Sequence, residues 1–175
     1  MVLLARASGA VRYPARFQLI LAANPCPCAA AKDVDCTCAA GIRRRYLGRL
    51  SGPLMDRVDI RVDLATLAFA DGAGESSSVV RQRVLSARDR AAHRWRGTPW
   101  RCAAEVPGAV VRRAWRPDRR EADLLDRAVR TGRLTGRGYD RVLRLALTTA
   151  HLAGRDRPST ADLATALALR CGEAR

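Results

Sequence analysis

The hydrophobic pattern of the chain changes from a strand-like period to a helical period on either side of a short polar segment. Residues 58–64 alternate apolar and charged side chains, the pattern of a strand with one buried face. Residues 71–78 are small and polar, which predicts a linker that also supplies a helix N-cap. From residue 79 onward, apolar side chains recur at helical spacing with arginines on the other face. The pattern therefore predicts two domains, residues 1–70 and 79–175.

Residues 79–175 are predicted to form a small all-helical bundle. The prediction depends on four amphipathic segments, at about residues 80–95, 119–130, 137–153 and 159–170. Ser159 and Asp162 have the spacing of a capping box at the start of the last segment. Residues 99–118 contain prolines and a glycine and are predicted to be irregular.

Residues 1–70 are predicted to form an α/β region. The apolar run 17–23 predicts a buried strand, and Asn24 follows it, just before a proline. Asn24 has two interpretations: ligand contact at the carboxyl end of a strand, or a turn-forming residue. A basic helix is predicted at about 41–50 and a short helical turn at 54–57. The predicted fold class is therefore α/β followed by all-α.

Four of the six cysteines lie close together in the sequence, in the pattern C-x-C-x7-C-x-C at Cys26, Cys28, Cys36 and Cys38. Adjacent C-x-C pairs would close strained disulfide rings, and a reducing cytoplasm disfavours disulfides. Zn²⁺ takes four thiolates tetrahedrally and can hold a loop that has no core of its own. The pattern thus predicts a structural zinc site, and the alternative is a surface loop with free thiols.

The chain is strongly basic, with 32 Lys+Arg against 17 Asp+Glu and a formal net charge of +15. Lys32 is the only lysine, so arginine carries nearly all of the positive charge. Two explanations stay open: a surface that binds a polyanion, or the codon usage of a GC-rich genome. No apolar stretch approaches the roughly 18 residues of a membrane span, and the apolar N-terminus is too short for a signal peptide. We therefore predict a cytoplasmic location and no membrane partner.

Several catalytic motifs are missing from the sequence. No P-loop of the form Gly-x4-Gly-Lys-Ser/Thr surrounds Lys32, and no apolar strand ends in the Asp-Glu pair that would hold Mg²⁺. His93 and His151 lie on arginine-rich helical segments without partners and are predicted to be solvated. The residues by themselves therefore define no complete active site.

Longer motifs nevertheless match a known family in chain order. They are Tyr13-Pro14-Ala15-Arg16-Phe17, Ala22-Ala23-Asn24-Pro25-Cys26-Pro27-Cys28, Arg45-Tyr46, Arg49-Leu50-Ser51-Gly52-Pro53-Leu54-Met55-Asp56-Arg57-Val58-Asp59, Val84 to Arg88, Tyr139-Asp140-Arg141-Val142-Leu143-Arg144, and Leu152-Ala153-Gly154. With these motifs the chain resembles the Mg-chelatase-like AAA+ ATPases of the ComM (YifB) family. The resemblance covers nearly all of this chain and about the final third of a typical member.

The resemblance implies a fold, an activity and partners. Members have an AAA+ core and a helical lid, and act as ring-shaped, ATP-driven motors that promote branch migration of DNA during natural transformation. Residues 1–70 then correspond to the C-terminal part of the core, an α/β remnant, and residues 79–175 to the lid. ATP with Mg²⁺ is the implied cofactor, a homo-oligomeric ring the implied assembly, and DNA the implied partner.

The resemblance also implies roles for four residues. Asn24 matches the sensor-1 position, which orients the attacking water. Arg57 matches the arginine finger, which reaches the nucleotide of a neighbouring subunit, and Arg49 is a second candidate for that role. Arg137 matches the sensor-2 arginine, which contacts the nucleotide phosphates. A guanidinium suits such positions because its planar fork neutralises charge on a transferring phosphoryl group. The alternative for each arginine is a solvated position in an arginine-rich chain.

The departure from the family is the absence of Walker A and Walker B motifs. We therefore expect a truncated ATPase that has no turnover alone and binds nucleotide weakly through Arg137. Two alternatives stay open: a stand-alone, zinc-stabilised basic module that binds nucleic acid, and an accessory subunit that completes another chain's nucleotide site.

Overall fold

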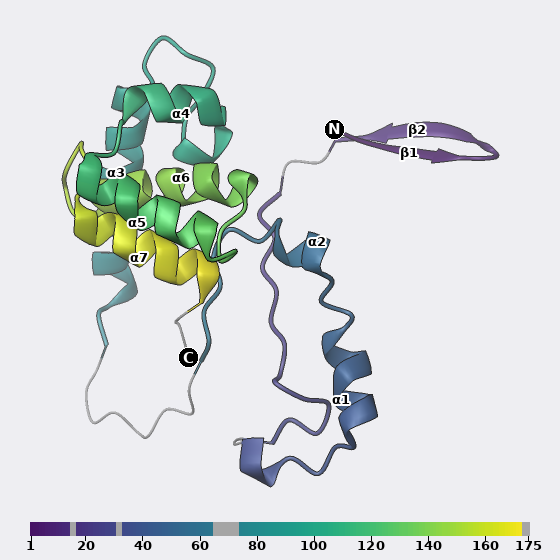
Figure 1. Cartoon of the computed structure of the whole chain (residues 1–175). Coiled ribbons are helices and arrows are strands. Elements are labelled where there is room, and N and C mark those ends of the chain that lie inside the picture. The colour runs from purple at the N-terminus through teal and green to yellow at the C-terminus, as the bar shows by residue number, and fades with distance from the viewer. Residues whose placement is uncertain (15–16, 31–32, 65–73, 173–175) are drawn as a thin grey trace. The chain divides into compact units, whose positions relative to one another are not determined.

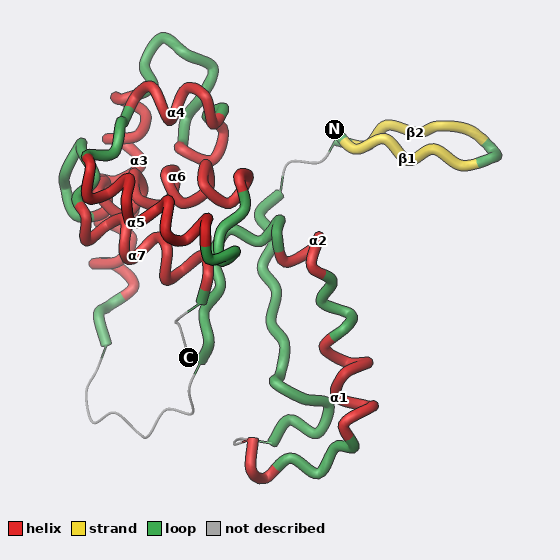
Figure 2. Tube along the Cα trace, viewed as in Figure 1, coloured by secondary structure: helices red, strands yellow, loops and turns green. Residues whose placement is uncertain are grey.

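The computed structural model describes residues 1–14, 17–30, 33–64 and 74–172 (Figure 1). They belong to two compact units, Met1–Ser51 and Gly52–Arg175. The elements of the first unit are β1 (Val2–Arg6), β2 (Gly9–Tyr13), a 3₁₀ turn at Asp33–Asp35 and α1 (Ala40–Leu47). Those of the second are α2 (Gly52–Met55), α3 (Ser77–Arg94), a 3₁₀ turn at Ala103–Glu105, α4 (Gly108–Ala114), α5 (Arg119–Arg130), α6 (Gly136–Leu152) and α7 (Thr160–Cys171). Two short strands thus precede a mainly helical region, as Figure 2 shows.

The two strands form an antiparallel hairpin in which Val2 pairs with Tyr13 and Arg6 pairs with Gly9. Gly9 has a φ of +134°, which suits a residue without a Cβ atom at the turn. Side chains on both strands are exposed. The sequence-based predictions did not include this hairpin, although an apolar run at residues 2–5 is followed by Ser8 and Gly9, which favour a turn.

The strands predicted at residues 17–23 and 58–64 are wrong, because the structure describes both segments as irregular. A strand is stable when a neighbouring strand pairs with its backbone. Among the described residues, β1 and β2 pair only with each other. A different bond anchors the second segment: the Arg61 N–H donates to the carbonyl of Leu169 on α7, at 2.7 Å. Alternation of side chains alone therefore does not show that a segment pairs in a sheet.

The described part of the first unit has almost no apolar core. Cys26 is its only buried residue within the described parts of 1–51. Large apolar side chains are exposed on the hairpin and after it: Val2, Leu3, Leu4, Val11, Tyr13, Phe17, Leu19, Ile20 and Leu21. Apolar burial therefore contributes little to holding the loop around Cys26 in place.

The second unit has a continuous apolar core centred on α6, which contacts α3, α4, α5 and α7. The residues with no exposed surface include Val111, Leu125, Val142, Leu143, Ala146, Leu147, Leu163 and Ala166. The helices predicted at 80–95, 119–130, 137–153 and 159–170 are confirmed as α3, α5, α6 and α7. No helix among the described residues is long and apolar enough to cross a membrane.

Side-chain caps begin the long helices. Ser76 accepts from the Val79 N–H at the start of α3, as predicted for the polar segment before it. The capping box predicted at Ser159 and Asp162 is confirmed, and a second one joins Asp118 and Glu121 before α5. These caps satisfy backbone N–H groups that have no partner within a helix.

The prediction that residues 99–118 are irregular is wrong in part, because α4 lies within them. Pro107 precedes the helix at its N-cap, a position that tolerates a missing N–H. Val106, Val111 and Trp115 are buried in the core that α6 provides. Tertiary burial therefore stabilises a helix too short to show in the local pattern.

Candidate functional site

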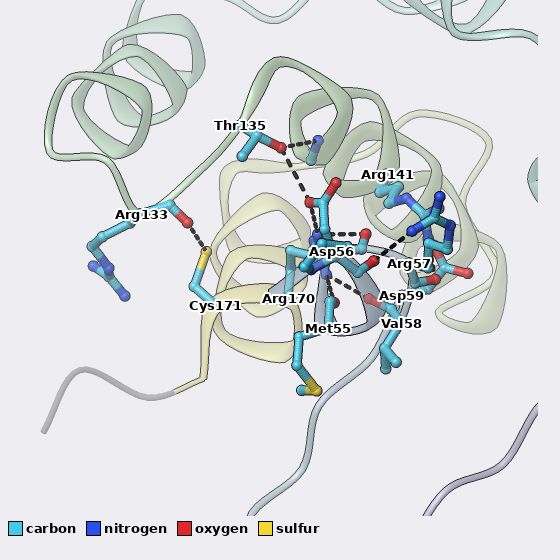
Figure 3. Close-up of polar contacts among 12 residues, drawn as sticks. Met55, Asp56, Arg57, Val58, Asp59, Arg133, Thr135, Arg141, Arg170 and Cys171 are labelled. Carbon is cyan, nitrogen blue, oxygen red and sulfur yellow. Dashed lines mark hydrogen bonds and ion pairs between the residues drawn. The ribbon is translucent and has the colours of Figure 1, made fainter. Parts of the chain in front are cut away.

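Residues 52–61 lie against α6 and α7 within the second unit, and a cluster of charged side chains joins them (Figure 3). Arg170, near the end of α7, is the central residue. Its guanidinium donates to the carbonyl oxygens of Met55 at 3.2 Å, of Asp56 at 2.9 Å and of Val58. It also donates to the Asp56 carboxylate at 2.8 Å. The Arg170 side chain is only 10% exposed, so its charge is neutralised inside this cluster.

Arg141 on α6 makes a parallel set of contacts. It donates to the Arg57 carbonyl at 2.7 Å and forms an ion pair with Asp59. Thr135 donates to the Asp56 carboxylate at 3.3 Å, and this carboxylate also accepts from Arg170. Donors from α6, α7 and the turn before α6 therefore converge on residues 55–59.

Arg57, the predicted finger, differs from Asp56 and Asp59 because α6 holds its backbone carbonyl and not its side chain. Its side chain is exposed and donates to the carbonyl of Pro53 at 2.8 Å, one helical turn earlier. Arg49, the alternative finger, lies in the first unit just after α1 and is also exposed. Its N–H donates to the Tyr46 carbonyl at 3.2 Å. The cluster around Arg170 and Arg141 thus includes the backbone of Arg57.

Arg137, the predicted sensor-2 residue, lies in the first turn of α6 and is exposed. Thr135 caps this helix by accepting from the Gly138 N–H at 3.0 Å. The guanidinium of Arg137 makes no hydrogen bond or ion pair with the residues that the structure describes. A cation beside the positive end of a helix dipole suits an anionic group, and a nucleotide phosphate has that charge.

Asn24, the predicted sensor-1 residue, is exposed in an irregular segment of the first unit. The structure therefore contradicts the strand that was expected to present it, and its role stays a prediction.

The four cysteines predicted to hold a metal are brought together in the first unit. Their sulfur atoms all lie within 4.8 Å of one another. The Sγ atoms of Cys26 and Cys28 are 3.1 Å apart, and those of Cys28 and Cys36 are 3.7 Å apart. In a tetrahedral zinc site, sulfur atoms are separated by about 3.8 Å, given Zn–S bonds of roughly 2.3 Å. Small shifts would place all four thiolates around one ion, so these cysteines can hold zinc.

The thiols of this cluster differ in acidity. Hydrogen bonding with Cys26, and then with the backbone at Ala30, lowers the pKa of Cys28 to about 6. The hydrogen bond with Cys28, and then burial, raises the pKa of Cys26. The lowered pKa of Cys28 favours its thiolate form, the form that binds a metal.

Two histidines were predicted to be solvated, and this is wrong for His151. Its side chain is buried on α6, a helix that packs against α3. Burial, and then the nearby charge of Arg94, lower the pKa of His151. His93 is exposed, and Arg96 contacts its ring at 3.1 Å.

Sequence reasoning did not single out Arg170, Asp56 or Arg141 as site residues. A signal for Arg170 was present, because it continues the apolar spacing of Leu163, Ala166 and Leu167 along one face of α7. A charged residue on the buried stripe of a helix needs a partner that neutralises it. Its partners lie more than a hundred residues earlier in the chain, which no local pattern reveals.

Comparison with known proteins identifies the family. The model described as magnesium chelatase, subunit ChlI, matches residues 1–71, and the model of its C-terminal region matches residues 74–170. The chain therefore belongs to the magnesium chelatase ChlI-like family. The predicted resemblance to ComM and YifB proteins is confirmed.

Individual relatives match nearly the whole chain. The uncharacterized protein Rv2897c of Mycobacterium tuberculosis is 54% identical over 170 residues, which is 95% of this chain and 34% of the relative. Competence protein ComM of Haemophilus influenzae is 30% identical over 174 residues, 97% of this chain and 33% of ComM. The uncharacterized protein YifB of Escherichia coli is 32% identical over 154 residues, 85% of this chain and 30% of YifB. The chain thus spans about a third of the length of these relatives.

Proposed function

We propose that this chain provides the sensor, arginine-finger and lid portion of a ring-forming AAA+ ATPase that acts on DNA. The observation that carries the proposal is the presentation of Arg57. Helix α6 holds its backbone carbonyl through Arg141, while its guanidinium lies outside on an exposed surface. A finger arginine needs this arrangement, because it must reach a nucleotide that another subunit holds.

In this proposal the residues have distinct roles. Arg57 neutralises the charge that develops on the transferring phosphoryl group, and Arg137 contacts the phosphates from the start of α6. Asn24 orients the attacking water. The exposed guanidinium groups of Arg57 and Arg137 suit the phosphates of ATP. The sequence has no matching site for Mg²⁺, because no apolar strand in it ends in an Asp-Glu pair.

The chain alone is proposed to have no ATP turnover. Its 175 residues contain no Gly-x4-Gly-Lys-Ser/Thr segment whose backbone N–H groups and lysine would cradle the β- and γ-phosphates. Residues outside this sequence would have to supply that site. DNA is the proposed partner because a net charge of +15, almost entirely arginine, favours contacts with backbone phosphates.

We also propose that Cys26, Cys28, Cys36 and Cys38 hold one structural Zn²⁺. The support is the clustering of their sulfur atoms in a unit that has almost no apolar core. Zinc bound by four thiolates has no open coordination position, so it would fix the loop and not take part in chemistry.

A chimera tests the proposed motor function. This chain replaces the matching third of Rv2897c, to which it is 54% identical. ATP hydrolysis is then measured for the parent, the chimera and the chimera carrying Arg57→Ala. We expect the chimera to hydrolyse ATP and the Arg57 change to lower kcat by about a thousandfold or more.

The isolated chain is the control and is expected to show no turnover. A parent or chimera without turnover would contradict the motor function. If the isolated chain also bound DNA, the alternative function, a zinc-stabilised nucleic-acid-binding module, would then be favoured. A chimera that hydrolyses ATP equally well with Arg57→Ala would contradict the finger role alone.

A further inference from the structure

We propose that Arg170 is a positioning residue, which latches residues 55–58 onto α7 and so fixes the backbone from which Arg57 projects. The role in catalysis rests on the proposed function, in which Arg57 is the finger. The latch itself is a property of the second unit, and it can be tested separately.

The contacts of Arg170 are concentrated on one short stretch of chain. Its guanidinium donates to three carbonyl oxygens, those of Met55, Asp56 and Val58, and to the Asp56 carboxylate. Carbonyls on both sides of Arg57 are therefore bound to one rigid, planar group. A lysine at this position would keep the charge but would lack the fork that spans four acceptors.

The surrounding contacts hold the same stretch from other directions. Arg141 donates to the Arg57 carbonyl itself, and the Arg61 N–H donates to the Leu169 carbonyl beside Arg170. The backbone is thus bound at residues 55–58 and again at residue 61. None of these bonds uses the Arg57 guanidinium, which stays exposed. Ordinary docking of a segment buries its side chains, whereas this arrangement binds the backbone and leaves the functional group outside.

The latch also connects the two candidate nucleotide-contacting arginines. Asp56 accepts from both Arg170 and Thr135, and Thr135 caps the helix on which Arg137 lies in the first turn. Phosphate binding at Arg137 that shifts the start of α6 would therefore move Asp56, which precedes Arg57 directly. Arg170 donates to the same carboxylate oxygen of Asp56 as Thr135 does, and also to the Asp56 carbonyl, and would transmit the shift to the finger segment.

Hydrogen exchange of the full chain tests the latch. Amides of Asp56, Arg57 and Val58 bond within the turn after α2, and that of Arg61 bonds to Leu169. We expect Arg170→Ala to speed exchange of the peptide spanning residues 52–61 at least about tenfold, because the latched state opens more often. Arg170→Lys should have a smaller effect in the same direction. Exchange in the core of α6 should rise by no more than exchange of residues 52–61, because global unfolding also breaks the latch.

Two further variants keep this experiment decisive. Asp56→Asn weakens the latch from the opposite side without altering α7, and it should also speed exchange of residues 52–61. Arg130→Ala removes an exposed arginine from α5 as a matched control and should have no effect. Unchanged exchange at 52–61 in both Arg170→Ala and Asp56→Asn would overturn the latch. Exchange that rises more in the core of α6 than at residues 52–61 would overturn it too, because Arg170 would then mainly stabilise the helical core.

Kinetics of the Rv2897c chimera test the positioning role. Arg170→Ala should lower kcat about tenfold or more with little change in KM for ATP, because the finger is misplaced while nucleotide binding persists. Arg170→Lys should recover part of kcat, and Arg130→Ala should match the unchanged chimera. If Arg170→Ala kept the kcat of the unchanged chimera while Arg57→Ala lost it, the positioning role would be overturned. If Arg57→Ala kept the kcat of the unchanged chimera, the finger assignment would be overturned instead. The hydrogen-exchange experiment would then be the test of the latch.

Discussion

The guanidinium of Arg170 bonds to both the carbonyl and the carboxylate of Asp56, which lies 114 residues earlier in the chain. This relationship makes residues 52–61 part of the helical unit, although the two family models divide the chain between residues 71 and 74. The sequence predicted a division at residues 71–78, part of which lies outside the described residues, so that division stays a prediction. The contacts of Arg170 instead favour a functional fragment that begins at Gly52.

The first prediction concerns that fragment. We expect residues 52–175 to be more stable than residues 75–175 by about 1–3 kcal/mol, because the shorter fragment loses the hydrogen bonds of Arg170 and Arg141. Urea unfolding followed by circular dichroism gives the two free energies of unfolding. Both fragments should unfold cooperatively, since the core around α6 is complete in each. Equal stabilities would show that the cluster around Arg170 contributes nothing to folding.

The second prediction concerns the core of the helical unit. Leu143 has no exposed surface, so Leu143→Ala should lower the free energy of unfolding by about 2–5 kcal/mol through lost burial and a residual cavity. Leu85 on α3 is 47% exposed, and Leu85→Ala should cost much less. Thermal or urea unfolding of the full chain measures both changes. Similar losses for the two variants would contradict the central place of α6.

The helices were predictable because their signal is local. Apolar spacing on α5, α6 and α7 and the capping box at Ser159 depend on residues a few positions apart. The strands at 17–23 and 58–64 were mispredicted because strand formation depends on a pairing partner distant in sequence. The cysteine cluster could be predicted from the sequence spacing of the cysteines alone, because four thiols within one short loop have little room to separate. Arg170 was missed because its partners are remote.

The third prediction is a pH dependence caused by Asp162. Burial alone would raise the pKa of this carboxyl, but hydrogen bonds from Arg155 and Ser159 outweigh it and lower the pKa to about 2 from 3.8. A pKa that is lower in the folded state gives stability above pH 4 that is lost as the pH falls toward 2. The expected loss is about 2 kcal/mol, since each pKa unit corresponds to about 1.4 kcal/mol.

Unfolding of the full chain by urea between pH 5 and pH 2 measures this loss. Asp162→Asn should remove this part of the pH dependence, and the difference between the two curves isolates Asp162 from the other carboxyl groups. Arg155→Ala should remove only part of it, because the bonds from Ser159 persist. Parallel curves for the original chain and Asp162→Asn would show that this carboxyl has an ordinary pKa.

The last prediction concerns metal. Protein purified under reducing conditions should contain about one zinc per chain, because four clustered thiolates satisfy the tetrahedral preference of Zn²⁺. Replacing Cys26 or Cys38 with serine should lower the zinc content several-fold, whereas Cys102→Ser should retain it, since Cys102 is exposed outside the cluster. Elemental analysis with a thiol count measures both quantities. Chelation should also speed proteolysis within residues 26–38 and leave the unfolding transition of the helical unit unchanged, because the metal would support only the first unit. Zinc-free protein with fully reduced thiols would identify the cluster as a loop of free cysteines.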